Sequence, residues 1–181
     1  MRPVPSTGKP MNSYSDALTA AALVITSGAL LGAAWSDVRH YLIPNRMPAA
    51  IALSYLLALP GMGWSVWLAG VATALVAFGV GAFLFARQWV GGGDVKLATA
   101  TILWAGPLLL ADFVTMVSIS GVVMAAVMVA LPKTRAAGPG EAQASALATR
   151  LNQPMAFGVP LAVGGLWIVA LQITSLAYGG G

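Results

Sequence analysis

The chain has 181 residues, of which 59% are hydrophobic and 8% are charged, and its nine Lys and Arg residues outnumber its five Asp and Glu residues. A soluble domain has roughly a quarter of its residues charged, so this composition excludes an ordinary soluble protein and predicts a membrane protein with basic cytoplasmic loops and no nucleic-acid partner. The absence of cysteine excludes disulfides, thiol catalysis and a cysteine-ligated zinc site, and the single histidine argues against a histidine-based metal site. We therefore expect no metal and no cofactor, and we expect the chemistry to be carried by carboxylates, hydroxyls or basic groups.

Long apolar runs predict an all-α fold of about six transmembrane helices. Residues 1–15 are rich in proline and serine and are predicted to be a disordered tail, whereas residues 16–181 form the membrane domain. About 20 apolar residues are needed to cross the hydrocarbon core as a helix. The predicted spans are residues 17–35, 49–64, 66–86, 97–110, 113–131 and 157–178.

Two of these spans have irregular features. The second is interrupted near Pro60-Gly61, where proline and glycine disfavour a continuous helix. The fourth, residues 97–110, is shorter than a bilayer requires, so its helix either begins earlier, at Asp94, or is preceded by glycine-rich backbone inside the bundle. Asp112 is predicted to lie in the short turn that follows the fourth span.

The charges of the loops predict the orientation in the membrane. Six spans place loops 36–48, 86–96 and 132–154 on one side, and all Lys and Arg residues outside the N-terminal tail lie in these loops. Basic loops remain in the cytoplasm, so both termini are predicted to lie outside. Asp37 and Asp94 then share the cytoplasmic side.

Asp94 follows three consecutive glycines and precedes an apolar run, while Asp37 lies near the end of the first span. Ionisable groups at such positions tend to be functional. Two carboxylates that share a water can hydrolyse a peptide bond, because one accepts a proton from the water while the other polarises the carbonyl. We therefore interpret the two aspartates as a catalytic pair. As a hypothesis, Asp94 at a helix start is the ionised member and Asp37 at a helix end the protonated one.

Other polar or small residues near the two aspartates are predicted to shape the site. Gly91 and Gly93 let a substrate backbone lie close; taken alone these glycines would indicate only a flexible turn, but with a second acid on the same side we favour a site. Lys96 either pairs with a substrate acid or anchors the helix to lipid phosphates. Pro44-Asn45 is predicted to separate one helix from the next.

Three segments, in order along the chain, resemble motifs of the type IV prepilin peptidases, a family of GxGD aspartic peptidases. Residues 36–39, Ser-Asp-Val-Arg, with residues 43–45, Ile-Pro-Asn, resemble the first aspartate motif. Residues 91–97, Gly-Gly-Gly-Asp-Val-Lys-Leu, resemble the GxGD motif, and residues 157–164 resemble the late Phe-Gly-x-Pro segment.

The resemblance implies an endopeptidase of the bacterial inner membrane that removes the leader of prepilin-like substrates at the cytoplasmic face. Asp37 and Asp94 would be its catalytic pair, and its substrates would carry a basic leader and an apolar helix. Long members of the family add a cytoplasmic domain with a CxxC zinc site and methylate the new terminus. This cysteine-free chain resembles the short form of Flp-type, or tight-adherence, pilus systems, so no methyltransferase activity is expected.

Two other classes of function remain open from the sequence. Aspartates in membrane helices also serve small ion- or proton-coupled transporters. A non-catalytic assembly subunit of a secretion system has a similar composition. The oligomeric state is not set by any feature of the sequence.

Overall fold

The computed structural model describes residues 13–130 and 157–178, nearly all of them helical and none of them in a strand. This confirms the predicted all-α fold. Helix α1 begins inside the predicted 1–15 tail, and the predicted 132–154 loop lies outside the described residues. The helices are α1 (Ser13–His40), α2 (Arg46–Leu57), α3 (Leu59–Met62), α4 (Trp64–Ala86), α5 (Gly92–Ala130) and α7 (Gly158–Tyr178).

Four helical segments are long and apolar enough to cross a membrane by length and composition: Tyr14–His40, Trp64–Ala86, Gly92–Met128 and Gly158–Leu176. Helix α2 is a shorter apolar helix. The segment in α5 has 37 residues. A straight helix of that length would measure about 56 Å, nearly twice the ~30 Å hydrocarbon core. The excess length is accounted for by a reversal of the chain within α5.

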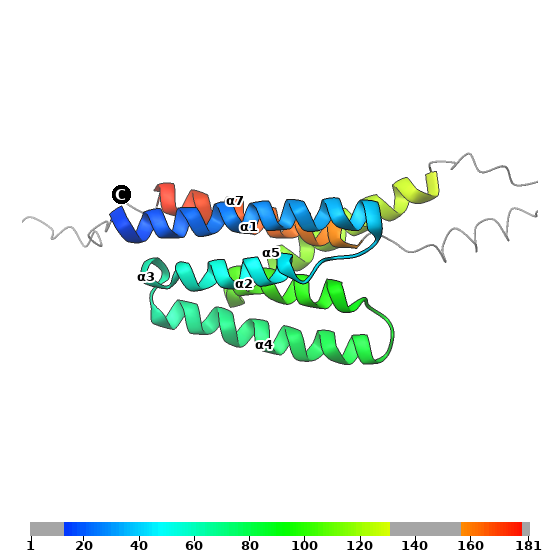
Figure 1. Ribbon diagram of the computed structural model, residues 1–181, viewed down its shortest axis with the longest axis horizontal. Coiled ribbons are helices and arrows are strands. Elements are labelled where there is room, and N and C mark those ends of the chain that lie inside the picture. The colour runs from blue at the N-terminus through cyan, green and yellow to red at the C-terminus, as the bar shows by residue number, and fades with distance from the viewer. Residues whose placement is uncertain (1–12, 131–156, 179–181) are drawn as a thin grey trace, which may run out of the picture.

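Helix α5 reverses at Gly106, whose φ of 55° and ψ of −167° are non-helical. Glycine adopts this conformation without the steric cost that a side chain imposes. Pro107 follows at the start of the next helical segment, where its missing N–H group costs nothing. Residues 92–105 therefore form a first arm and residues 107–130 a second arm (Figure 1).

Both arms pack on α7. The Trp104 carbonyl of the first arm accepts a hydrogen bond from Gln172 Nε2 at 3.0 Å, and Ser120 Oγ of the second arm donates to the Pro160 carbonyl at 3.4 Å. The prediction of a turn at Asp112 was wrong, because this residue is an exposed position within the second arm. The turn lies six residues earlier than predicted, at a Gly-Pro pair inside the apolar run.

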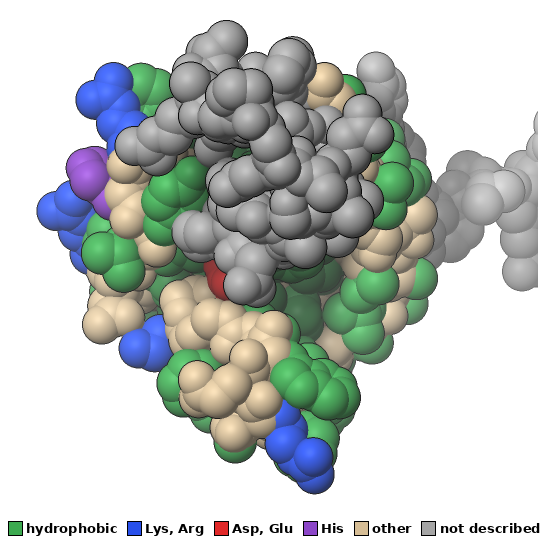
Figure 2. Space-filling model, turned by 90° about the vertical axis from the view of Figure 1, so that its right-hand side faces the viewer, with side chains coloured by type: hydrophobic (Ala, Val, Ile, Leu, Met, Phe, Trp, Pro, Cys, Tyr) green, Lys and Arg blue, Asp and Glu red, His purple; other side chains and the backbone are tan. Residues whose placement is uncertain are grey.

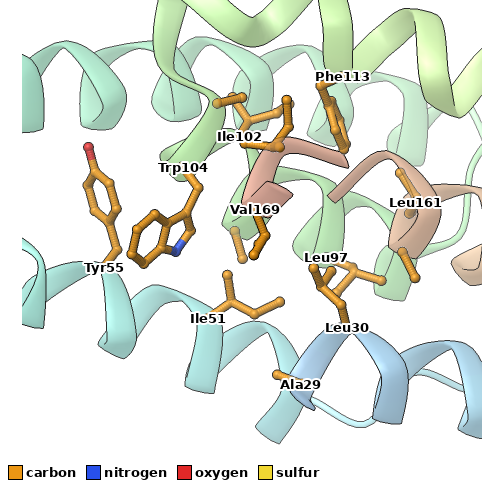
Figure 3. Packing of buried hydrophobic residues seen from close by; sticks show 14 of the residues in the cluster. Ala29, Leu30, Ile51, Tyr55, Leu97, Ile102, Trp104, Phe113, Leu161 and Val169 are labelled. Atoms are coloured by element: carbon orange, nitrogen blue, oxygen red, sulfur yellow. The ribbon is translucent and has the colours of Figure 1, made fainter. Parts of the chain in front are cut away.

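The core lies around α2 and the first arm of α5 (Figure 3). Ile51 and Tyr55 of α2 pack with Leu97 and Trp104 of the first arm, and each of these side chains is at most 2% exposed. By contrast, only Gly70 and Ala74 are buried in α4. α2 and the first arm therefore each bury one face in the core, whereas most of the surface of α4 lies on the outside of the bundle.

Polar contacts join α2 to its neighbours within this core. Thr26 Oγ1 of α1 and Ser54 Oγ of α2 are 2.8 Å apart and buried. The Tyr55 hydroxyl donates to the Trp67 carbonyl at 3.0 Å, and Trp67 Nε1 donates to the Tyr55 carbonyl at 3.2 Å. Such paired groups satisfy one another where no water is available.

One end of the bundle gathers the helix ends that face the predicted basic loops, and we call it the site end. It contains the C-terminal ends of α1 and α4 and the N-terminal ends of α2, α5 and α7 (Figure 1). The start of α1 and the end of α7 lie at the opposite end. Basic side chains lie around the rim of the site end, and an acidic one is visible near its centre, beside an apolar hollow (Figure 2). The described Lys and Arg residues all belong to the site end: Arg39, Arg46, Arg87 and Lys96.

Candidate active site

Asp37 lies in the last turn of α1 and is 5% exposed. Its Oδ2 atom accepts a hydrogen bond of 2.6 Å from the backbone N–H of Gly158, the first residue of α7. The first N–H groups of a helix have no partner within the helix, and a carboxylate is a good acceptor for them. Asp37 therefore caps α7 from the neighbouring helix.

The contact requires glycine at position 158. A Cβ atom there would lie 2.8 Å from Asp37 Oδ2 and 3.0 Å from Asp37 Cβ, closer than atoms of these types normally approach. In the sequence, this segment was noted only because residues 157–164 resemble a Phe-Gly-x-Pro motif. No pattern in the sequence indicated that its glycine meets Asp37.

Asp94 lies in the first turn of α5 and is partly buried. Its carboxylate accepts a backbone hydrogen bond from Gly91. The Gly91 carbonyl in turn accepts the Val95 N–H at 3.1 Å, so this glycine closes the start of the helix. A Cβ atom at position 91 would lie 2.9 Å from Asp94 Oδ2, which shows how closely the backbone approaches the acid.

Gly93, the other predicted site-shaping glycine, contacts a different segment. A Cβ atom at position 93 would lie 3.2 Å from the Cβ atom of Ile43, in the connection between α1 and α2. The connection itself is held by Ser36 Oγ, which donates to the Leu42 carbonyl at 2.8 Å. Tyr41, at a φ of 51°, donates its N–H to the Asp37 carbonyl at 2.9 Å and ends α1.

The two carboxylates interact electrostatically with each other, although 57 positions separate Asp37 from Asp94 (94 − 37). Phe157, next to Gly158, lines the same cavity as Asp94. Three helix ends, those of α1, α5 and α7, therefore bring both acids to the site end. The hypothesis that Asp37 is the protonated member loses its physical basis, because each aspartate faces a helix N-terminus.

Lys96 and Asn45 contact each other. Lys96 Nζ donates to Asn45 Oδ1 at 3.0 Å, and Asn45 is the N-cap residue of α2. Pro44 lies directly before it, and its carbonyl accepts the Met47 N–H at 3.0 Å in the first turn of α2. The structure thus places these three predicted residues at a junction between α2 and α5, where Lys96 binds Asn45 and neither acid.

A cavity of about 670 Å³ opens beside Asp94, between α4 and both arms of α5. The described residues that line it are apolar apart from two threonines and Asp94, the one ionisable residue among them. Lining residues of α4 run from Ala72 to Leu84. The 12 steps from residue 72 to residue 84 correspond to roughly 18 Å of helix. The cavity is therefore an elongated groove with a carboxylate at its site end.

A family model described as the type IV leader peptidase family matches residues 23–128. The matched region contains both aspartates and the groove-lining parts of α4 and α5, and it ends before α7. Comparisons with curated proteins and with solved structures found no match.

Proposed function

Because the chain belongs to the type IV leader peptidase family, we propose that it is an aspartic endopeptidase that uses Asp37 and Asp94 as its catalytic pair. Membership implies a protease of the leader-peptidase type with prepilin-type substrates in general. The finer proposal is that it removes the leader of Flp-type prepilins at the cytoplasmic face of the bacterial inner membrane. The observation that carries this proposal is the placement of both aspartates at helix ends of the site end, where Asp37 also binds the start of α7.

Peptide hydrolysis by two carboxylates needs a water between them and one proton on the pair. The ionised carboxylate removes a proton from the water as its oxygen attacks the scissile carbonyl carbon. The protonated carboxyl group donates a hydrogen bond to the carbonyl oxygen and stabilises the charge that develops there. The nitrogen of the leaving amine then takes a proton from the pair, and the peptide bond breaks.

The backbone around each aspartate supports this chemistry. The Gly158 N–H holds Asp37, and Gly91 holds Asp94, so neither carboxylate depends on a flexible side chain for its orientation. Backbone donors at helix starts are fixed by the helices themselves. Positioning of this kind accounts for a large share of enzymatic rate enhancement.

The apolar groove beside Asp94 fits the helical part of a prepilin-type substrate. A helix lying along α4 in this groove would place its cytoplasmic end next to Asp94 and Gly91. The bond to be cut must lie in extended backbone next to Asp94, where the exposed Gly91 presents no side chain to the substrate. The basic leader of the substrate would then extend from the site end toward the anionic lipid surface of the cytoplasmic leaflet.

Leader removal can be followed in cells that co-express the protein and a Flp-type prepilin. We expect Asp37→Asn and Asp94→Asn each to lower the cleavage rate at least a hundredfold, the lower range of a general acid–base contribution. Asp112→Asn is the matched control, because that acid is exposed and lies in the second arm near the opposite end. Its cleavage should equal that of the unchanged protein.

Undiminished cleavage in both active-site variants would remove the catalytic pair from the proposal. Normal cleavage together with a loss of proton or ion flux would instead indicate a transporter. Equal amounts of each variant in the membrane, measured by immunoblot, exclude a loss of the protein as the cause.

A further inference from the structure

Asp94 and Lys96 lie on opposite flanks of α5. Residues that are two positions apart in an α-helix point in directions that differ by about 200° around the helix axis. Asp94 accordingly lines the groove between α4 and the second arm, whereas Lys96 lines a separate cavity of about 430 Å³ among α2, α4 and the first arm. Thr99 lies between the two flanks and lines both. The second cavity is thus distinct from the one at the aspartates.

The second cavity, which we call the Lys96 groove, has apolar walls and a polar end. Small residues of α2, among them Ala49 and Ala52, leave space opposite Leu75 and Phe78 of α4. These two α4 side chains are 66% and 47% exposed, so the groove opens to the outside of the bundle. Among the lining residues that the structure describes, Lys96 is the one ionisable group, and it lies at the site end.

Lys96 retains donors for an anion. An ammonium group has three N–H donors, and the structure gives one of them to Asn45. Within the described part of the chain, no carboxylate forms an ion pair with Lys96, and its side chain is exposed. Asn45 accepts through Oδ1, so its amide nitrogen is a second donor at the same place. The exposed Arg46 follows directly in the chain.

We propose that the Lys96 groove binds one anionic phospholipid, with the lipid phosphate on Lys96 and Asn45 and an acyl chain between α2 and α4. Basic pockets between membrane helices on the cytoplasmic side are suited to such head groups. An apolar slot that ends in a cation matches the two parts of the lipid. A second copy of the chain fits less well, because the site ends of two copies share one membrane level and would bring four described cations toward four others.

Native mass spectrometry of the full chain in detergent, titrated with phosphatidylglycerol or phosphatidylcholine, measures this binding directly. We expect one tightly held phosphatidylglycerol per chain and weaker binding of phosphatidylcholine. Lys96→Gln should weaken phosphatidylglycerol binding roughly fivefold, the effect of one basic residue near a lipid surface. Arg87→Gln makes the same charge change at the site end but outside the groove, with its guanidinium 5.0 Å from the Phe83 ring. The affinity of the Arg87→Gln variant for phosphatidylglycerol should not change.

Filling the groove tests the place of the acyl chain. Ala52→Phe should abolish the tight site, and Ala49→Trp provides a second test at an exposed lining position if the first variant does not fold. Thermal unfolding of each variant reports whether the bundle is intact. The readout is lipid binding and not leader cleavage, so its outcome is independent of the proposed peptidase.

Three results would overturn the inference. Equal losses of phosphatidylglycerol affinity in Lys96→Gln and Arg87→Gln would show that the lipid is attracted by positive charge in general and not by the Lys96 groove. Equal affinity for both lipids would show that no head group is recognised. A groove-filling variant that changes the oligomeric state in light scattering, with phosphatidylglycerol binding intact, would make the groove an interface between copies.

Discussion

Asp37 and Gly158 are 121 positions apart in the chain, and their hydrogen bond joins the first and last described helices at the site. The contact has two requirements, a carboxylate at the end of α1 and a missing side chain at the start of α7. It also explains how a helix outside the family-matched region, residues 23–128, participates in the geometry of the site. Gly158 is therefore a positioning residue for Asp37.

Gly158→Ala tests this role. The added methyl group would meet Asp37 Oδ2 at 2.8 Å and force the carboxylate or the start of α7 to move. Displacements of about 1 Å at an active site cost roughly a hundredfold in rate. We expect kcat for leader cleavage to fall by that order while KM changes much less, because most of the residues that line the groove belong to α4 and α5.

The matched control for this substitution is Gly79→Ala in α4, where nothing lies within 4 Å of the added methyl group. It should cleave at the normal rate. If Gly158→Ala also retained its full kcat, the backbone donor would have no role in positioning Asp37.

At the scale of elements, the reversal in α5 determines which residues reach the site end. Without it, the first arm would continue away from Asp94, and the second arm would not return to line the groove with Leu110 and Val114. The same reversal places both arms against α7. The conformation of Gly106 is thus a requirement of the whole bundle.

Gly106→Ala is expected to destabilise the protein by about 1–3 kcal/mol, because alanine is strained at a φ of 55° with a ψ of −167°. Gly28→Ala is the opposite case, a helical glycine with nothing within 4 Å of a new methyl group. It should raise stability by about 0.5–1 kcal/mol. Unfolding in mixed detergent micelles at increasing SDS fraction measures both changes. Equal stability of the two variants would contradict the importance of the Gly106 conformation.

At the scale of the whole molecule, the two ends of the bundle differ in charge. The four described cations and both proposed catalytic acids lie at one end, while the described termini lie at the other (Figure 1). The positive-inside rule supports the proposal that the site end faces the cytoplasm. This orientation is a proposal that follows from charge alone.

Single cysteines report the orientation cleanly, because the chain has none of its own. His40→Cys lies at the site end and Ser65→Cys at the opposite end, and both positions are exposed. A membrane-impermeant maleimide added to intact spheroplasts should label position 65 and not position 40. Membrane permeabilisation should make position 40 reactive as well. Labelling of position 40 before permeabilisation would invert the proposed topology.

The sequence by itself determined the all-α membrane fold and the placement of Asp37 and Asp94 at the same end. These features follow from local properties, namely the length of apolar runs and the charge of the loops between them. The turn at Gly106 was missed because a Gly-Pro pair within an apolar run looked less like a break than the charged Asp112. The break depends on a backbone conformation, not on polarity.

Only the tertiary structure decided that Gly158 holds Asp37, that Lys96 binds Asn45, and that Asp94 and Lys96 open onto different grooves. In a soluble helix the buried face stands out as the apolar one. Membrane helices are apolar on the face that meets lipid as well as on the face that meets protein. The sequence therefore carries little signal for the rotation of each helix about its axis, and that rotation is what selects the partners of these side chains.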